Sequence, residues 1–514
     1  MWYHRTMTDN TATSPEKSAS GRRARWVILG IFSVLTLALS WPVIANLSSR
    51  IPGTATWAFD ESTFVWNIWY FKHALLDLHV SPLHSELIWF PLGIDLILYT
   101  FNFFNALIAL PLQVAINLPL ASNVTLLLAT LFSGFGAYLL AFYVLRFTFH
   151  ATRHSQPATR NTQYPIPNTI LHLAALLGGV IYAFASNRAI YAALGHYDMV
   201  TTQWLPFYAL YLLKTLREPK LKNAILAGLF FALASLAEMI FASFLALLTV
   251  VVLLASWRAG RNVPQAAGLR LWRRPRQSGG LRYRAILRAG WPAVLGRLAL
   301  AGAVALLIWS PVLIPIAREF LTADYALTGW GESVKLSADV VGLVTPTDLN
   351  PVGAIPPWSP RPGGHGDTAP TDSLGRWTAA LRAVEEGKGR FGDINTVFVG
   401  YVTLGLALLG AWRGRGRVKV WTWSALAFGV LVLGPLLQIN GRYRFSLAGL
   451  LPEGVTVPLP FTLLHFIPFI NANRAPNRNS VILMLALAML AAYGAAWLLG
   501  KISESANQRI NESA

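Results

Sequence analysis

Long runs of apolar residues with almost no charge constrain this chain more than any other feature of its sequence. Four clear examples are residues 26–46, 394–412, 420–439 and 481–499. A helix of about 20 residues crosses the hydrocarbon core of a bilayer, which is roughly 30 Å thick. Only helices and closed barrels satisfy their backbone in lipid, and these runs are too long for barrel strands. The sequence therefore predicts an all-α polytopic membrane protein.

The same criterion predicts about 10 transmembrane helices along the chain, with 10–12 as the range. They lie near residues 26–46, 123–145, 170–186, 201–214, 223–238, 241–257, 293–316, 394–412, 420–439 and 479–499. Only 13% of the residues are charged, compared with about a quarter in soluble proteins, which supports this interpretation. The first run follows a basic stretch but is too long for a signal peptide, so we expect a retained signal anchor.

The basic residues predict how the chain is oriented in the membrane. Lys and Arg outnumber Asp and Glu by 42 to 23, which gives a formal net charge of +19. The excess gathers in short segments such as 22–25, 214–222 and 413–419, which share one side of the membrane. Because cytoplasmic loops are enriched in Lys and Arg, we expect both termini in the cytoplasm. The basic charge is then a consequence of topology, and we expect no binding of nucleic acid.

The predicted spans divide the chain into two membrane regions. In order, the segments are a disordered cytoplasmic tail (1–25), an amino-terminal membrane module (26–257) with a first external loop (47–122), a basic cytoplasmic loop (258–292), a carboxyl-terminal membrane region (293–499) with external loops (317–393 and 440–478), and a cytoplasmic tail (500–514). The first external loop interleaves tryptophans with charges, a composition typical of short helices in the headgroup region. His365 and Asp367 in the later loop could be ligands, or ordinary residues of a Gly- and Pro-rich segment.

Two segments leave the number of spans open. Residues 97–118 are long enough to cross the membrane, but a span there would carry Arg146 and Arg153 to the outer face. We therefore expect an interfacial or re-entrant hairpin, with an eleventh or twelfth span as the alternative. Residues 223–257 are free of charge apart from Glu238. Two short helices with a tight external turn at Glu238 explain this pattern better than one long helix.

Two adjacent acids, Asp60 and Glu61, stand a short way beyond the first predicted span. A carboxylate on the outer face can act as a general base toward an acceptor hydroxyl. It can also hold a divalent cation, such as Mg²⁺ or Mn²⁺, that steadies a phosphate leaving group. The alternative is the start of a helix, with Asp60 as the cap and Glu61 favoured by the helix dipole. Metal use is open, with Asp60 as the ligand if a metal binds.

Basic and polar residues on the same predicted face can bind a phosphate. Arg474 and Arg478 are four residues apart before the last span, and on a helix this spacing places both guanidiniums on one face. Such a pair can bind a lipid phosphate through charge-assisted contacts, although arginines near helix ends also snorkel to headgroups. His196 and Gln203 can hydrogen-bond a phosphate or sugar oxygen, and Arg188 can supply a third phosphate contact. For these three residues the alternative is a structural role.

The order of these motifs resembles a family of membrane enzymes. The pair Asp60-Glu61 after the first span is similar to the acidic motif of protein O-mannosyltransferases. Four further motifs resemble bacterial integral-membrane glycosyltransferases of the GT-C superfamily: Asp60-x5-Trp66-x2-Trp69, Trp89-Phe90-Pro91-x-Gly93, Gly195-His196-x6-Gln203-Trp204-Leu205-Pro206 and Arg474-x-Pro476-x-Arg478. The resemblance covers residues 26–257 and the last helix, whereas 258–393 match nothing in the family.

The resemblance implies a GT-C-like fold and an inverting transfer of sugar to an acceptor hydroxyl at the outer face of a bacterial plasma membrane. It also implies that the donor is a sugar linked to polyprenyl phosphate, and that Asp60, with Glu61 beside it, is the catalytic carboxylate. Several branches carry a second acidic motif, for which Asp198 is the nearest candidate here. A lipid or sugar transporter or flippase is the alternative, and a scaffold protein is a third. The transporter reading has less support, because the spans are nearly free of charge and show no repeat.

Overall fold

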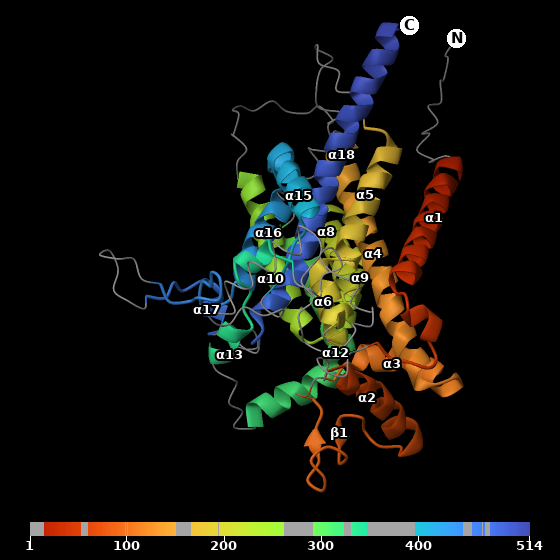
Figure 1. Ribbon diagram of the computed structural model, residues 1–514, viewed down its shortest axis with the longest axis vertical. Coiled ribbons are helices and arrows are strands. Elements are labelled where there is room, and N and C mark those ends of the chain that lie inside the picture. The colour runs from red at the N-terminus through yellow and green to blue at the C-terminus, as the bar shows by residue number, and fades with distance from the viewer. Residues whose placement is uncertain are drawn as a thin grey trace, which may run out of the picture.

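The computed structural model describes residues 15–52, 60–97, 99, 101–150, 166–193, 195–261, 291–322, 330–346, 396–445, 455–464, 466–467 and 473–513. Over these residues the chain forms a bundle of long helices with shorter helices across one end (Figure 1). His365 and Asp367 lie outside the described residues, as do nearly all of the basic loop 258–292 and most of the external loop 317–393.

Helices account for nearly all of the regular structure in the described segments. In chain order the α-helices are α1 (Pro15–Leu39), α2 (Asp60–Lys72), α3 (Phe103–Ala115), α4 (Leu118–His150), α5 (Asn168–Ala183), α6 (Ser186–Ala193), α7 (Tyr197–Val200), α8 (Trp204–Arg217), α9 (Leu221–Ala237), α10 (Ile240–Arg261), α12 (Trp291–Thr322), α13 (Trp330–Lys335), α15 (Tyr401–Gly414), α16 (Lys419–Val432), α17 (Phe461–Leu464) and α18 (Ser480–Ser513). Shorter turns are η1 (Val43–Asn46), η2 (His73–Asp77), η4 (Val341–Leu343), η6 (Arg415–Arg417) and η7 (Pro476–Asn479). The strands β1 (His84–Ser85) and β2 (Ile94–Asp95) pair antiparallel, with His84 opposite Asp95.

Four described helical segments are long and apolar enough to cross a membrane. They cover Leu118–Phe149, Asn168–Ala192, Pro292–Glu319 and Pro476–Asn511. The protein is therefore a multi-pass membrane protein, as the apolar runs predict. The expected number of about 10 spans stays a prediction, because several other apolar helices have fewer than 18 residues.

Two predicted spans in the carboxyl-terminal region are shorter than expected. The run 394–412 becomes helical only at Tyr401, after Gly400 takes a positive φ of 81°. Before it, Val397 and Val399 donate backbone hydrogen bonds to the carbonyls of Gly342 and Leu343. The run 420–439 leaves its helix at Val432, because Gly434 has a φ of 75° and Pro435 follows it. Apolar composition alone does not reveal these breaks.

α18 is the central helix of the bundle. Its most apolar 18-residue window is 89% buried, compared with 22% for the corresponding window of α12. It packs against α15, α5 and α16. Gly410 of α15 lets the two backbones approach closely, since a Cβ at that position would lie 2.0 Å from the carbonyl oxygen of Leu490. Close approach through small residues is the usual basis of helix packing in membranes.

The first external loop forms a layer across one end of the bundle. α2, α3 and the β1–β2 pair lie there, beyond the ends of the long helices (Figure 1). α3 has 13 residues, a length of about 20 Å, which is less than the hydrocarbon thickness of about 30 Å. It packs on α2, α4 and α9. The geometry of α3 supports an interfacial helix rather than an additional span.

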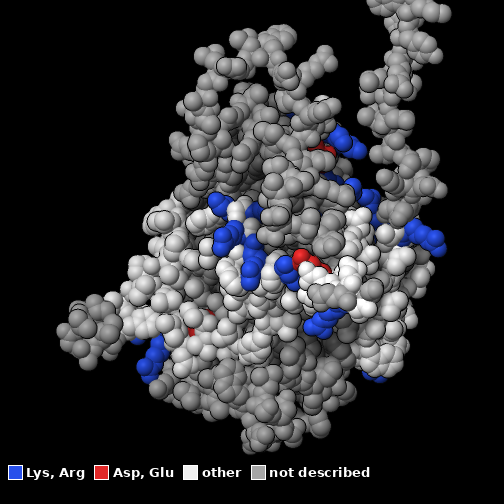
Figure 2. All heavy atoms as spheres, turned by 90° about the horizontal axis from the view of Figure 1, so that it is seen from above, with Lys and Arg blue, Asp and Glu red and all other residues white. Residues whose placement is uncertain are grey.

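The other end of the bundle is the one where α1 begins and α18 ends (Figure 1). Figure 2 looks onto this end and shows Lys and Arg over a larger area than Asp and Glu. Several of these side chains stack on aromatic rings: Lys214 lies 5.4 Å and Arg217 5.7 Å from the ring of Tyr143, and Arg413 lies 4.4 Å from that of Trp497. Lys and Arg thus predominate among the charged side chains described at this end. That this side is cytoplasmic stays a prediction.

Candidate active site

The candidate residues gather where four segments meet, at the end of the bundle opposite the basic one. These segments are the start of α2, residues 195–203 between α6 and α8, the turn between α9 and α10, and η7 before α18. Ion pairs connect them, because Asp60 contacts His196, and Arg478 contacts both Asp198 and Glu238. The structure therefore brings acids from the front of the chain to a guanidinium from its tail.

Asp60 begins α2 and faces His196 across the site. Its Oδ2 lies 3.0 Å from Nδ1 of His196, and the side chain of Asp60 is 48% exposed. The hydrogen bond from His196 lowers the pKa of Asp60, and the charges of His196, Arg478 and Arg474 act in the same direction against the effect of burial. Asp60 is therefore an ionised carboxylate that stays accessible from solvent.

Glu61 has a different environment from its neighbour. Burial raises the pKa of Glu61, and the adjacent charge of Asp60 raises it further, against the effect of a backbone hydrogen bond. Its Oε2 atom is buried and has no hydrogen-bond partner among the described residues. The pKa values of these two adjacent carboxyls are shifted in opposite directions, so Asp60 can act as a base while Glu61 retains its proton more readily.

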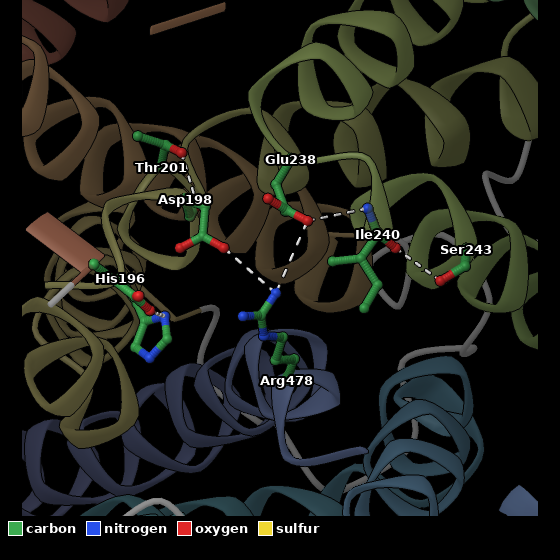
Figure 3. Close-up of polar contacts among 8 residues, drawn as sticks. His196, Asp198, Thr201, Glu238, Ile240, Ser243 and Arg478 are labelled. Carbon is green, nitrogen blue, oxygen red and sulfur yellow. Dashed lines mark hydrogen bonds and ion pairs between the residues drawn. The ribbon is translucent and has the colours of Figure 1, made fainter. Parts of the chain in front are cut away.

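Arg478 reaches into a buried cluster of acids (Figure 3). Its Nη1 lies 3.4 Å from Oδ2 of Asp198 and 4.0 Å from Oε1 of Glu238. The side chain of Asp198 is 0% exposed, that of Glu238 17% and that of Arg478 21%. The backbone N–H of Ile240 donates to Oε1 of Glu238 at 3.4 Å. Of the three, only Arg478 and Glu238 keep some access to the outside.

The segment that carries His196 and Asp198 is held by local turn chemistry. Gly195 takes a φ of 73°, which a residue with a side chain adopts only under strain. One turn of helix, α7, follows, and the hydroxyl of Thr201 donates to the carbonyl of Asp198 at 2.8 Å. The ring of Tyr197 stacks on Phe64 of α2 at 6.0 Å, and its hydroxyl donates to the carbonyl of Pro52. These contacts fix the segment against α2 and so align His196 with Asp60.

The two arginines of the tail do not share a helix face, so that part of the prediction is wrong. α18 begins only at Ser480, and Pro476 starts the 3-10 turn η7 that contains Arg478. Arg474 precedes this turn and is exposed. Both guanidiniums nevertheless act on the charge of Asp60. Proximity to the site therefore comes from the fold of residues 473–479, and not from helical spacing.

Arg188 and Gln203 lie deeper in the protein than a substrate contact would suggest. The guanidinium of Arg188 is buried and donates to the carbonyls of Val200 and Ala183 at 3.0 and 2.9 Å, and to the hydroxyl of Thr130 at 2.8 Å. These bonds tie α6 to α4 and to the segment before α8. Gln203 is also buried, and its Oε1 has no hydrogen-bond partner among the described residues. Contact of either residue with a substrate stays a prediction.

Two residues of this site were not among the expected site residues. Glu238 was interpreted mainly as a polar residue of a turn or a partner between helices, and that turn is confirmed, since α9 ends at Ala237 and α10 begins at Ile240. Its contact with Arg478 joins positions far apart in the chain. Tyr191 packs edge-on against the ring of His196, with centroids 5.9 Å apart. A signal for Glu238 did exist, because an acid inside an apolar stretch is a candidate for function.

A metal centre is not evident in this part of the chain. Within the described residues, no group of three or more His, Asp or Glu side chains is placed to hold a metal ion.

Comparisons with known proteins give matches among solved structures only. No protein-family model matches the sequence, and no curated protein matches it. The archaeal oligosaccharyltransferase AglB from Archaeoglobus fulgidus, solved with an inhibitory peptide and a dolichol-phosphate, is similar over 91% of this chain, with 11% identity and a TM-score of 0.40. The chain spans 50% of the length of that protein.

Proposed function

We propose that this protein is a membrane glycosyltransferase that moves a sugar from a polyprenyl-phosphate-linked donor to an acceptor hydroxyl, with inversion. The observation that carries the proposal is the meeting of an accessible, ionised Asp60 with His196, Arg474 and Arg478 at one end of the bundle. A base and a set of cations at the same site are what transfer from a phosphate-linked sugar requires. The site lies at the end opposite the basic residues, and because cytoplasmic loops are enriched in Lys and Arg, we propose that this end is at the outer face of a bacterial plasma membrane.

In the proposed reaction, Asp60 accepts the proton of the acceptor hydroxyl as its oxygen attacks the anomeric carbon. The bond between that carbon and the phosphate oxygen breaks, and the phosphate leaves with the bonding electron pair. Arg478 and Arg474 offset the charge that develops on the leaving phosphate. His196 donates a hydrogen bond to Asp60 and so holds the carboxylate in place. The isoprenoid chain stays in the bilayer throughout.

The proposal is tested by release of polyprenyl phosphate from a radiolabelled donor, with the protein in detergent micelles or in vesicles. Asp60→Asn keeps the shape of the side chain and removes the base, and general-base assistance is typically worth about 10²–10⁴-fold in rate. Asp77→Asn is the matched control, since Asp77 lies in η2 directly after α2 and pairs only at the surface with Lys72 and His73. Wild-type turnover by a folded Asp60→Asn protein excludes Asp60 as the base. Uptake of donor into vesicles without cleavage would favour a transporter instead.

A further inference from the structure

The cluster around Arg478 contains more acid than its one guanidinium can balance. Asp198 and Glu238 both face Nη1 of Arg478, at 3.4 and 4.0 Å (Figure 3). Asp198 is completely buried, and neither of its carboxylate oxygens has a hydrogen-bond partner among the described residues. A buried carboxylate without a donor is costly, so each such group requires an explanation.

A proton shared between the two carboxyls supplies the missing donor. With both acids ionised, the cluster would hold two negative charges and one positive charge away from water, which is unfavourable. With one proton, the acids can hydrogen-bond to each other and the charges balance. Burial is the main cause that raises the pKa of Glu238 to about 8, and the charge of Asp198 raises it further, while Arg478 lowers it. Glu238 is therefore the member of the pair that holds the proton near neutral pH.

We propose that Glu238 is a positioning residue for the donor. Glu238 shares one proton with Asp198, and in the absence of donor both acids pair with Arg478. When the donor binds, the phosphate of the lipid carrier replaces these acids as the partner of the Arg478 guanidinium. This inference rests on the proposed function, since it requires that Arg478 binds a phosphate. Glu238 makes no contact with the reacting atoms in this scheme. It sets how much of the charge of Arg478 is free for the ligand.

Few other ionisable groups face Glu238 in the part of the chain that the structure describes. The charges that act on it are those of Asp198 from α7 and Arg478 from η7, and Tyr191 and Asp60 act in turn on Arg478. Among the helices packed against α9, α3 contains no ionisable residue, α8 has no acid or base before Lys214 at its far end, and α10 has none before Arg258. α12 carries Arg318 and Glu319 in its last turns, beyond the apolar residues Val312 and Ile316 that pack near Met239. The titration of this site is therefore expected to be that of the acid pair.

The proposal links phosphate binding to a proton. Below about pH 8 Glu238 is neutral, and one carboxylate, Asp198, competes with the ligand for Arg478. As the pH rises through that value Glu238 ionises, and a second negative charge then holds Arg478 and repels the phosphate. The affinity of the protein for the phosphate must therefore fall with rising pH, by up to about tenfold per pH unit for one linked proton. A bound phosphate ester has a second pKa of about 6, so its own titration lies below this window.

The experiment measures binding of a short-chain polyprenyl monophosphate to the full-length protein in detergent between pH 7 and 9.5. For the wild type we expect the Kd to rise by about tenfold or more above pH 8. Glu238→Gln keeps the hydrogen bond from Ile240 but cannot ionise, so its Kd is expected to change by less than about twofold over the same range. Glu504→Gln, which alters a half-buried acid paired with Lys501 at the other end of α18, is expected to follow the wild type.

A second measurement needs no variant and guards against a Glu238→Gln protein that does not fold. Calorimetric titration of the wild type at pH 8.5, in two buffers of different ionisation enthalpy, counts protons taken up on binding. We expect about half to one proton per phosphate bound. Binding without proton uptake, or the same pH dependence in folded Glu238→Gln, overturns the assignment of Glu238 while leaving the proposed function intact. A wild type that binds no polyprenyl phosphate at any pH overturns both.

Discussion

Replacing Arg478 by Gln tests whether the ion pairs among Arg478, Asp198 and Glu238 stabilise the folded protein. At an effective dielectric constant of about 20, an ion pair at 3.4 Å is worth about 5 kcal/mol. Part of this attraction offsets the desolvation of Asp198, which is fully buried. Breaking a buried pair by removing one partner typically costs about 3–5 kcal/mol, because the remaining charge is left uncompensated. We therefore expect Arg478→Gln to lower the free energy of unfolding by about 3–5 kcal/mol at pH 7.

A double-mutant cycle isolates the interaction from the other effects of each substitution. Asp198→Asn removes the same pair from the other side, so the double variant should be little worse than Arg478→Gln alone. The expected coupling free energy is about 2–3 kcal/mol, within the range measured for residues in one network. Equilibrium unfolding in mixed micelles of a mild detergent and sodium dodecyl sulfate provides the measurement. Arg442→Gln, an exposed arginine of the segment after α16, is the control and should lie within about 0.5 kcal/mol of the wild type.

Two outcomes would refute this reasoning. A coupling free energy below about 0.5 kcal/mol would mean that the two side chains do not compensate each other in the folded protein. Destabilisation by Arg478→Gln that is no larger at pH 9 than at pH 7 would be equally damaging. Glu238 ionises in the wild type as the pH rises through about 8, and without Arg478 that charge is harder to form, so the penalty of the missing guanidinium should grow.

Three further outcomes are expected. His196→Gln removes the main cause of the lowered pKa of Asp60, so the acid limb of the pH–rate profile should move to higher pH, because the base is then ionised over a narrower range. Gly410→Ala should destabilise the folded protein by about 1–3 kcal/mol or more in thermal unfolding, since the new Cβ would lie 2.0 Å from the carbonyl oxygen of Leu490. Gly405→Ala on the same helix is the control, because its new Cβ would have no atom within 4 Å. The chain has no cysteine, so Ser49→Cys and Ser505→Cys can be labelled singly, and a membrane-impermeant maleimide applied to intact cells should react with the first variant alone.

The membrane architecture could be predicted from the sequence because its physical cause is local. Hydrocarbon excludes charge and requires a satisfied backbone, so each apolar run carries its own evidence of a membrane helix. The break at Glu238 was predicted on the same basis, since a single acid interrupts a long apolar stretch. The ends of α15 and α16 were misplaced because they depend on the positive φ of Gly400 and Gly434. An apolar run does not encode that choice of backbone conformation.

The site could be predicted in part, because its residue types are informative but their pairing is not. Asp60, His196 and Arg478 were identified as candidates by charge and by their place beyond the ends of predicted spans. That Asp60 pairs with His196, and that Arg478 turns to Glu238 instead of lying beside Arg474, follows from contacts between distant segments. The same limitation applies to Arg188, whose charge suggested a ligand although its donors are used by backbone carbonyls.

The large positive charge of the chain does not by itself draw an anionic donor into this site. Basic residues of the opposite end, such as Lys214, Arg217 and Arg413, lie toward the far end of α18, a helix of 34 residues and about 50 Å in length. Ions screen exposed charges over about 8–10 Å at physiological salt, so that end contributes little at the site. The charge that a phosphate meets at the site is then set by nearby groups, chiefly by Arg478 and the acids Asp198 and Glu238 that face it. Affinity for a phosphate must then depend on whether Glu238 carries its proton, which is why one neutral acid can govern binding in a chain of formal charge +19.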